Sequence, residues 1–311
     1  MSGAPDSATL KNIMRHHPAR PFRTLAAAAS LSLLALSSQS LLPTAAADTL
    51  PHLSADCFTY SPGQVIRTGH GVTIQGMKAE LTGTQHRISV VSATAVDHKQ
   101  KMDEAALTRL NAAVAYAALT AYHRGMTDVC STQPLPEVEE VKNTLPELHW
   151  SGITMTRPDR VSTASSAHVN VLSTTPTIHV VFDASGLHSP GAILLPPTLS
   201  GDVSFTPAAQ PPYHLTINRF QTVINGSDVT GTGTVVAGEG TKNLKADVHL
   251  SIGRIGEMID RVNRVAPTEL KAALLIARFM SAREPDHHVG WHIVVKNGTV
   301  KVNGVELPIP F

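Results

Sequence analysis

Short runs of alternating apolar and polar residues fill most of the chain after residue 57. In residues 86–96, Ile88, Val90, Ser92, Thr94 and Val96 fall on one side of an extended chain, and this period of two is typical of a half-buried strand. Similar runs, separated by glycines, prolines and polar turns, predict further strands at residues 63–67, 71–75, 77–81, 148–156, 167–172, 177–182, 199–206, 213–223, 228–236, 245–252, 291–295 and 299–302. So many short strands at regular spacing indicate a large antiparallel sheet.

Asn-Gly pairs mark the turns near the end of the chain. Asn225-Gly226, Asn297-Gly298 and Asn303-Gly304 each stand between two predicted extended segments. This dipeptide is the strongest short signal for a tight hairpin turn. After the last of these turns, Pro308 and Pro310 cannot donate to a ladder, so residues 307–311 are expected to be an edge or cover strand.

The period changes to that of a helix in residues 101–124. Leu107, Leu110 and Val114 follow helical spacing, and alanines occupy many of the remaining positions. Asp103 or Asp97 could cap the beginning of this helix. Its small residues allow close packing, so we expect this Ala-rich helix beside the N-terminal strands.

Two more helices are predicted in the C-terminal part. Residues 254–265 carry a clean apolar stripe, whereas residues 267–282 are apolar on nearly every side. A helix of the second kind has to be enclosed by other elements. The fold class that we predict is therefore α+β, with a large curved antiparallel sheet that partly wraps the two C-terminal helices.

Residues 1–47 read as an export signal. Basic residues precede an apolar run at residues 25–36, and Ala45-Ala46-Ala47 supplies the pattern that a signal peptidase cuts. We expect cleavage after Ala47 and a periplasmic location. The apolar run is too short to cross a bilayer, so no stable membrane span is expected after cleavage. Whether translation starts at Met1 or Met14 stays open.

The mature chain divides into three parts. Residues 48–133 hold the N-terminal strands and the Ala-rich helix, residues 134–147 form a connector rich in Pro and Glu, and residues 148–311 form the β-rich C-terminal region. The alternative is that residues 148–311 form one continuous domain with residues 48–133.

Charge and composition exclude some partners. The whole chain has a net charge of +1, and without residues 1–47 it has −2, because four bases and one acid lie in the leader. Such a balance gives no electrostatic footprint for nucleic acid. Aromatic residues make up only 4% of the chain, which argues against base-stacking platforms and aromatic carbohydrate sites.

Cys57 and Cys130 are the two cysteines of the chain. An even pair in an exported protein is expected to form one disulfide. A redox or metal pair is the alternative, but neither a CxxC motif nor a His-rich neighbourhood supports it.

The C-terminal half resembles a family of alphaproteobacterial envelope proteins, a domain of unknown function with AsmA-like repeats. The segments that carry the resemblance are His149-Trp-Ser-Gly-Ile-Thr154, Leu215-Thr-Ile-Asn-Arg-Phe220, Val229-Thr-Gly-Thr-Gly233, Gly290-Trp-His-Ile-Val-Val-Lys-Asn-Gly-Thr-Val300 and Val302-Asn-Gly-Val-Glu-Leu-Pro308. The resemblance implies a curved antiparallel sheet in the periplasm and a role in envelope assembly or lipid movement. It implies no catalytic residues.

Motifs that would carry catalysis or bind a cofactor are absent from the sequence. The best metal candidates are His287, His288 and His292, beside Glu284 and Asp286. Pro285 and Gly290 prevent the helix that would place His288 and His292 together, so we expect no metal site and no cofactor there.

The function that we predict is therefore non-catalytic: an exported protein that binds an apolar ligand or lipid, or an envelope protein. The alternative is an envelope hydrolase or a metal-dependent enzyme that uses the histidine-bearing residues 284–292.

Overall fold

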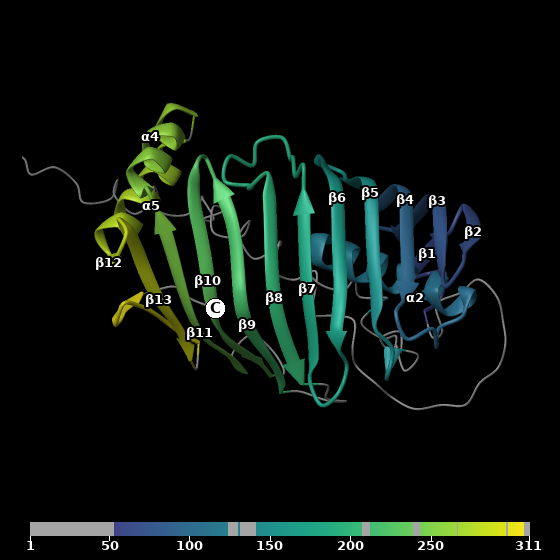
Figure 1. Cartoon of the computed structure of the whole chain (residues 1–311). Coiled ribbons are helices and arrows are strands. Elements are labelled where there is room, and N and C mark those ends of the chain that lie inside the picture. Colours follow the sequence, from purple (N-terminus) through teal and green to yellow (C-terminus); the bar gives the residue numbers. More distant parts are fainter. Residues whose placement is uncertain are drawn as a thin grey trace, which may run out of the picture.

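Fifteen strands form a single antiparallel sheet in the part of the chain that the computed structural model describes (Figure 1). The described residues are 53–123, 130, 141–206, 212–238, 243–265, 267–296 and 298–307. The order along the sheet is β1-β3-β4-β5-β6-β7-β8-β9-β10-β11-β13-β14-β15, with β2 paired to β3 and β12 paired to β13. The prediction of a large antiparallel sheet is confirmed.

The N-terminal strands are β1 Phe58–Ser61, β2 Gln64–Thr68, β3 Gly71–Leu81 and β4 His86–Asp97. The middle strands are β5 Pro146–Arg157, β6 Arg160–Ser173, β7 Ile178–Ser185, β8 Thr198–Thr206 and β9 Tyr213–Ile224. The C-terminal strands are β10 Ser227–Ala237, β11 Leu244–Gly253, β12 Ala282–Arg283, β13 His288–Lys296, β14 Thr299–Val302 and β15 Val305–Leu307.

The largest differences from the predicted strand bounds concern β3 and β6. Residues 71–75 and 77–81 form one strand, β3, which is irregular at Gly76, where φ is +75°. Strand β6 begins at Arg160, seven residues before the predicted start. The sequence pattern missed residues 160–166 because they are mostly polar and lack apolar alternation.

Among the described residues, the first helix is α2 (Glu104–His123), which lies against β3 and β4. Its first turn is capped by Asp103, whose Oδ1 accepts a hydrogen bond of 2.8 Å from the backbone N–H of Ala106. The helix is buried along most of its length, and together with β3, β4 and β5 it encloses the largest apolar cluster of the molecule. Trp150 of β5 belongs to this cluster.

Asp97 is the second candidate cap, and the structure gives it a different role. This buried carboxylate at the end of β4 accepts hydrogen bonds from the backbone N–H groups of Lys99, Lys101, Met102 and Leu145. Burial alone would raise the pKa of Asp97, but these four donors hold the pKa below its usual value. Asp97 thereby fixes the chain between β4, α2 and β5.

The predicted disulfide is confirmed. Cys57 and Cys130 are bonded, with 5.0 Å between their Cα atoms, and both side chains are fully buried in the apolar cluster under α2. The bridge ties the beginning of the sheet to a residue that follows α2 in the chain.

The second apolar cluster surrounds α4 (Ile255–Val265). Its buried stripe consists of Ile255, Met258, Ile259 and Val262 and packs with Trp291 of β13. The stripe agrees with the one read from the sequence.

The third helix, α5 (Thr268–Phe279), departs from its prediction. Leu274 and Ala277 pack against the α4 cluster, but Leu275, Ile276 and Phe279 are exposed. The expectation that strands enclose this helix on every side is therefore wrong. Apolar residues on all sides of a helix predict that it contacts other surfaces. They do not show that those surfaces belong to the same chain.

The turns confirm two of the three Asn-Gly predictions. Asn225 and Gly226 join β9 to β10, and Asn303 and Gly304 join β14 to β15, with positive φ at all four residues. Asn297 lies outside the described residues. The same holds for the leader with its cleavage site at Ala47, for residues 131–140 around the connector, and for residues 308–311.

Candidate functional site

One face of the middle strands carries a continuous set of apolar side chains, which we call the apolar strip. It consists of Val169 and Val171 on β6, Ile178, Val180 and Phe182 on β7, Val203 and Phe205 on β8, Leu215 and Ile217 on β9, and Val235 on β10. Every second residue of a strand points to the same side, so ordinary alternation places these residues together.

The register of the strands makes the strip continuous. Val171 lies opposite Val180, and Val180 lies opposite Val203 on the next strand. Further along, Leu215 pairs with Phe205 on one side and Val235 on the other. Apolar contact therefore passes without a break from β6 to β10.

Gly201 shapes the strip beside Phe182. A Cβ atom on Gly201 would lie 2.4 Å from Cζ of the Phe182 ring, so the ring lies directly over the glycine backbone. No larger residue fits at Gly201 unless the ring moves.

Helices stand at both ends of this face. The clusters of α2 and of α4 contain the residues of β3–β5 and of β9–β13 that share the side of the strip. Figure 1 shows α2 behind the N-terminal strands and α4 and α5 at the opposite end of the sheet. Within the described residues, the cluster that forms the strip contains strand residues alone.

The strip has an inner and an outer part. Val171, Ile178, Val180, Val203 and Leu215 are buried, whereas Val169, Phe182, Phe205, Ile217 and Val235 are only partly buried. The partly buried side chains are the surface that a ligand could touch.

The opposite face carries a series of histidine–carboxylate pairs. His168 lies 3.0 Å from Asp183 and 2.9 Å from Glu147, measured between ring nitrogens and carboxylate oxygens. A similar pair joins His179 to Asp202, with 2.7 Å between Nε2 and the carboxylate oxygen. Because these partners sit on neighbouring strands, only the register brings them together, and no spacing in the sequence signals the pairs.

The pairs shift the pKa values of two groups. The hydrogen bond from His98 holds the pKa of Glu147 below its usual value, and His168 lowers it further. Burial alone would lower the pKa of His168, but its hydrogen bonds to Asp183 and Glu147 raise that pKa above its usual value. The pairs are thus stabilising contacts of a polar sheet face.

The three histidines that the sequence singled out are placed apart. His287 is exposed in the turn between β12 and β13, with φ at +61°. His288 and His292 lie on β13, where His288 Nε2 is 3.0 Å from Asp228 and His292 Nε2 is 2.7 Å from Asp247. The structure brings each of the last two to its own carboxylate and not to a shared centre.

Ser251, His288, Asp228 and Glu284 form a hydrogen-bonded chain whose residue types resemble those of a hydrolase. Ser251 Oγ donates to Glu284 at 2.5 Å, because an ionised carboxylate only accepts. The same oxygen lies 3.1 Å from His288 Nδ1, and Nε2 of the same ring lies 3.0 Å from Asp228. This hydrogen-bonded chain ties the β12–β13 turn to β10 and β11.

Metal ligands are not gathered elsewhere either. Among the residues that the structure describes, no three His, Cys, Asp or Glu side chains are grouped in a way that could hold a metal ion.

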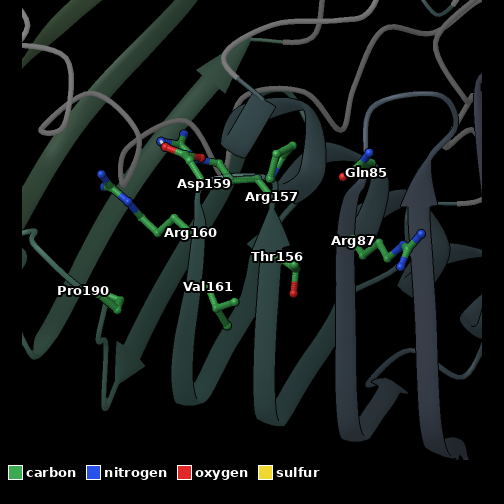
Figure 2. A pocket seen from close by; sticks show the side chains of 9 residues that line it. Gln85, Arg87, Thr156, Arg157, Asp159, Arg160, Val161 and Pro190 are labelled. Carbon is green, nitrogen blue, oxygen red and sulfur yellow. Dashed lines mark hydrogen bonds and ion pairs between the residues drawn. The ribbon is translucent and has the colours of Figure 1, made fainter.

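An open pocket of about 540 Å³ lies at the β5–β6 turn (Figure 2). Arg87, Arg157 and Arg160 are among its lining residues. Arg87 is paired with Glu80, and Arg157 is paired with Asp159. Two of its three positive charges are thus already compensated, and none of its lining residues belongs to the apolar strip.

Comparisons with known proteins identify no relative. No family model matches the chain, and no curated protein and no solved structure matches it. The resemblance to AsmA-like envelope proteins therefore stays a prediction. None of the helices in the described ranges combines the length and the apolar character that crossing a bilayer requires.

Proposed function

We propose that the protein is an exported, non-catalytic envelope protein that binds an apolar ligand, such as a lipid acyl chain, along the apolar strip. The observation that carries this proposal is the strip itself: ten apolar side chains from five strands, on the helix-bearing face, with no charged member. Clefts that bind apolar ligands are lined mainly by such side chains.

The arrangement of the helices supports the same function. An acyl chain laid across β6–β10 would have α2 at one end and the α4 cluster at the other. In this proposal the sheet curves toward α4 and α5 and partly wraps them, which closes the C-terminal end of the binding surface.

Export rests on the sequence of the leader. The apolar run followed by Ala45-Ala46-Ala47 predicts cleavage and a periplasmic location. The buried Cys57–Cys130 disulfide is consistent with an oxidising compartment. The resemblance to AsmA-like proteins, which are associated with lipid movement, adds to the proposal without carrying it.

The hydrolase alternative is not adopted. It needs the histidines of residues 284–292 to meet at one centre, and the structure directs His288 to Asp228 and His292 to Asp247.

A matched pair of variants on β7 tests the proposal. Phe182 belongs to the strip, and its neighbour Val181 points to the opposite face. Phe182→Asn should weaken the binding of a fluorescent fatty acid by about tenfold or more, since burying a Phe side chain is worth about 1.5–3 kcal/mol. Val181→Asn should leave the affinity unchanged, and thermal unfolding of both variants verifies that they are folded.

Native mass spectrometry of protein purified from its own envelope provides the second measurement. A co-purifying lipid that Phe182→Asn loses and Val181→Asn keeps would agree with the proposal. It would be overturned by protein that carries no lipid and binds no fatty acid, or by equal losses in the two variants.

A further inference from the structure

Large apolar side chains are concentrated on the outer side of α5. Phe279 is 92% exposed, Ile276 61% and Leu275 54%, and Val265 at the end of α4 is 68% exposed. The three residues of α5 share one side of a helix because Phe279 is four positions from Leu275 and three from Ile276. An exposed apolar group of this kind on a soluble fold marks a contact with another surface.

The inner side of α5 is fixed in place. Leu274 and Ala277 pack on the α4 cluster, and the indole N–H of Trp291 donates a hydrogen bond of 2.8 Å to the backbone carbonyl of Ala277. Trp291 itself is buried. The helix is therefore held in an orientation that presents Leu275, Ile276 and Phe279 outward.

Basic residues flank this apolar side. Arg264 precedes the turn into α5. On the helix, Lys271 lies one turn before Leu275, and Arg278 directly precedes Phe279. None of the three forms an ion pair with a side chain in the described part of the chain. By contrast, Arg67 pairs with Glu104, and Arg254 pairs with Asp228.

We propose that the outer side of α5, together with Val265, docks the protein on the surface of an anionic lipid bilayer. Apolar side chains that enter the boundary between headgroups and acyl chains, flanked by bases that meet anionic headgroups, are the features of a helix that lies in a membrane surface. The unpaired bases favour this occupant over an uncharged apolar protein surface.

The position of the helices suits such a contact. Figure 1 shows α4 and α5 at one corner of the sheet, past the ends of β10 and β11. In this position α5 can meet a flat surface while the strands stay in water. This inference stands independently of the ligand proposed for the apolar strip.

Vesicle co-sedimentation tests the docking. The protein should bind vesicles that contain phosphatidylglycerol, bind phosphatidylcholine vesicles more weakly, and lose affinity as salt is added. Ile276→Ser with Phe279→Ser should lower the partition coefficient by about tenfold or more. Arg264→Gln with Arg278→Gln should lower it by a similar factor on anionic vesicles only.

Val91→Ser is the matched control. Val91 is 69% exposed on β4, at the other end of the sheet, and its replacement should leave vesicle binding unchanged. A Phe279→Trp reporter should be quenched by lipids with brominated acyl chains, and the two native tryptophans add little to that signal because both are buried.

Three results would overturn the proposal. The first is no binding to anionic vesicles, and the second is binding that neither double variant reduces. The third is a dimer of the native protein that Ile276→Ser with Phe279→Ser dissociates, since a second copy would then be the occupant. Fatty-acid binding measured on the same variants reports on the apolar strip, so the two proposals can fail separately.

Discussion

The indole N–H of Trp150 donates a hydrogen bond of 2.8 Å to the side-chain oxygen of Asn111, which joins β5 to the middle of α2. Both side chains are buried, and Nδ2 of Asn111 donates to the carbonyl of Leu107 one turn earlier. A polar residue inside an Ala-rich helix thus satisfies the one polar atom that the Trp150 side chain brings into the core.

Asn111→Leu should destabilise the protein by about 1–3 kcal/mol, because it leaves the buried indole N–H without an acceptor. Urea unfolding followed by circular dichroism measures the change. A double-mutant cycle with Trp150→Phe isolates the contact. The double variant should lose less free energy of unfolding than the two single variants lose together. Losses that simply add would show that the hydrogen bond contributes nothing.

Asp97→Asn should destabilise the protein and make its stability less dependent on pH in acid. The native pKa of Asp97 is held below its unfolded value, so its contribution is complete above the unfolded pKa of about 4 and is lost as the pH falls through the native pKa. Urea midpoints of native protein and variant should therefore differ most near neutral pH and converge in acid. A constant difference down to strongly acidic pH would contradict this role.

Cys57→Ala with Cys130→Ala should lower the free energy of unfolding by about 4 kcal/mol, because the bridge restricts a long loop of the unfolded chain. Urea unfolding with and without reductant measures the effect. The reductant should lower the urea midpoint of the native protein and leave that of the variant unchanged. The variant thus controls for effects of the reductant other than cleavage of the disulfide. Two free thiols in protein recovered from the envelope would contradict export to an oxidising compartment.

Alternation and turn chemistry were sufficient to predict most of the strands. The positions of β4, β9 and β10 follow from apolar residues at every second position and from the turn at Asn225 and Gly226. Strand β6 was predicted too short because its first half, rich in Ser and Thr, owes its extended form to pairing with β5. Tertiary pairing overrides a weak local pattern there.

The candidate sites were harder to predict. The apolar strip depends on which strand lies beside which, and the pair of His168 with Asp183 depends on a register that no local pattern encodes. For α5, a helix with apolar residues on all sides satisfies the same sequence pattern whether it is enclosed by its own chain or meets another surface. Phe279 therefore could not be assigned to either environment from the sequence.

Most neighbouring strands of the sheet are also neighbours in the chain. During synthesis from the N-terminus, most strands can therefore pair with a strand that has already been made. The sheet can grow at one edge before the C-terminal residues are synthesised. Local pairing of this kind keeps the entropy cost of each step small. A protein built this way can assemble progressively, and truncation from its C-terminal end would remove whole layers of pairing before it reaches the disulfide-bridged beginning.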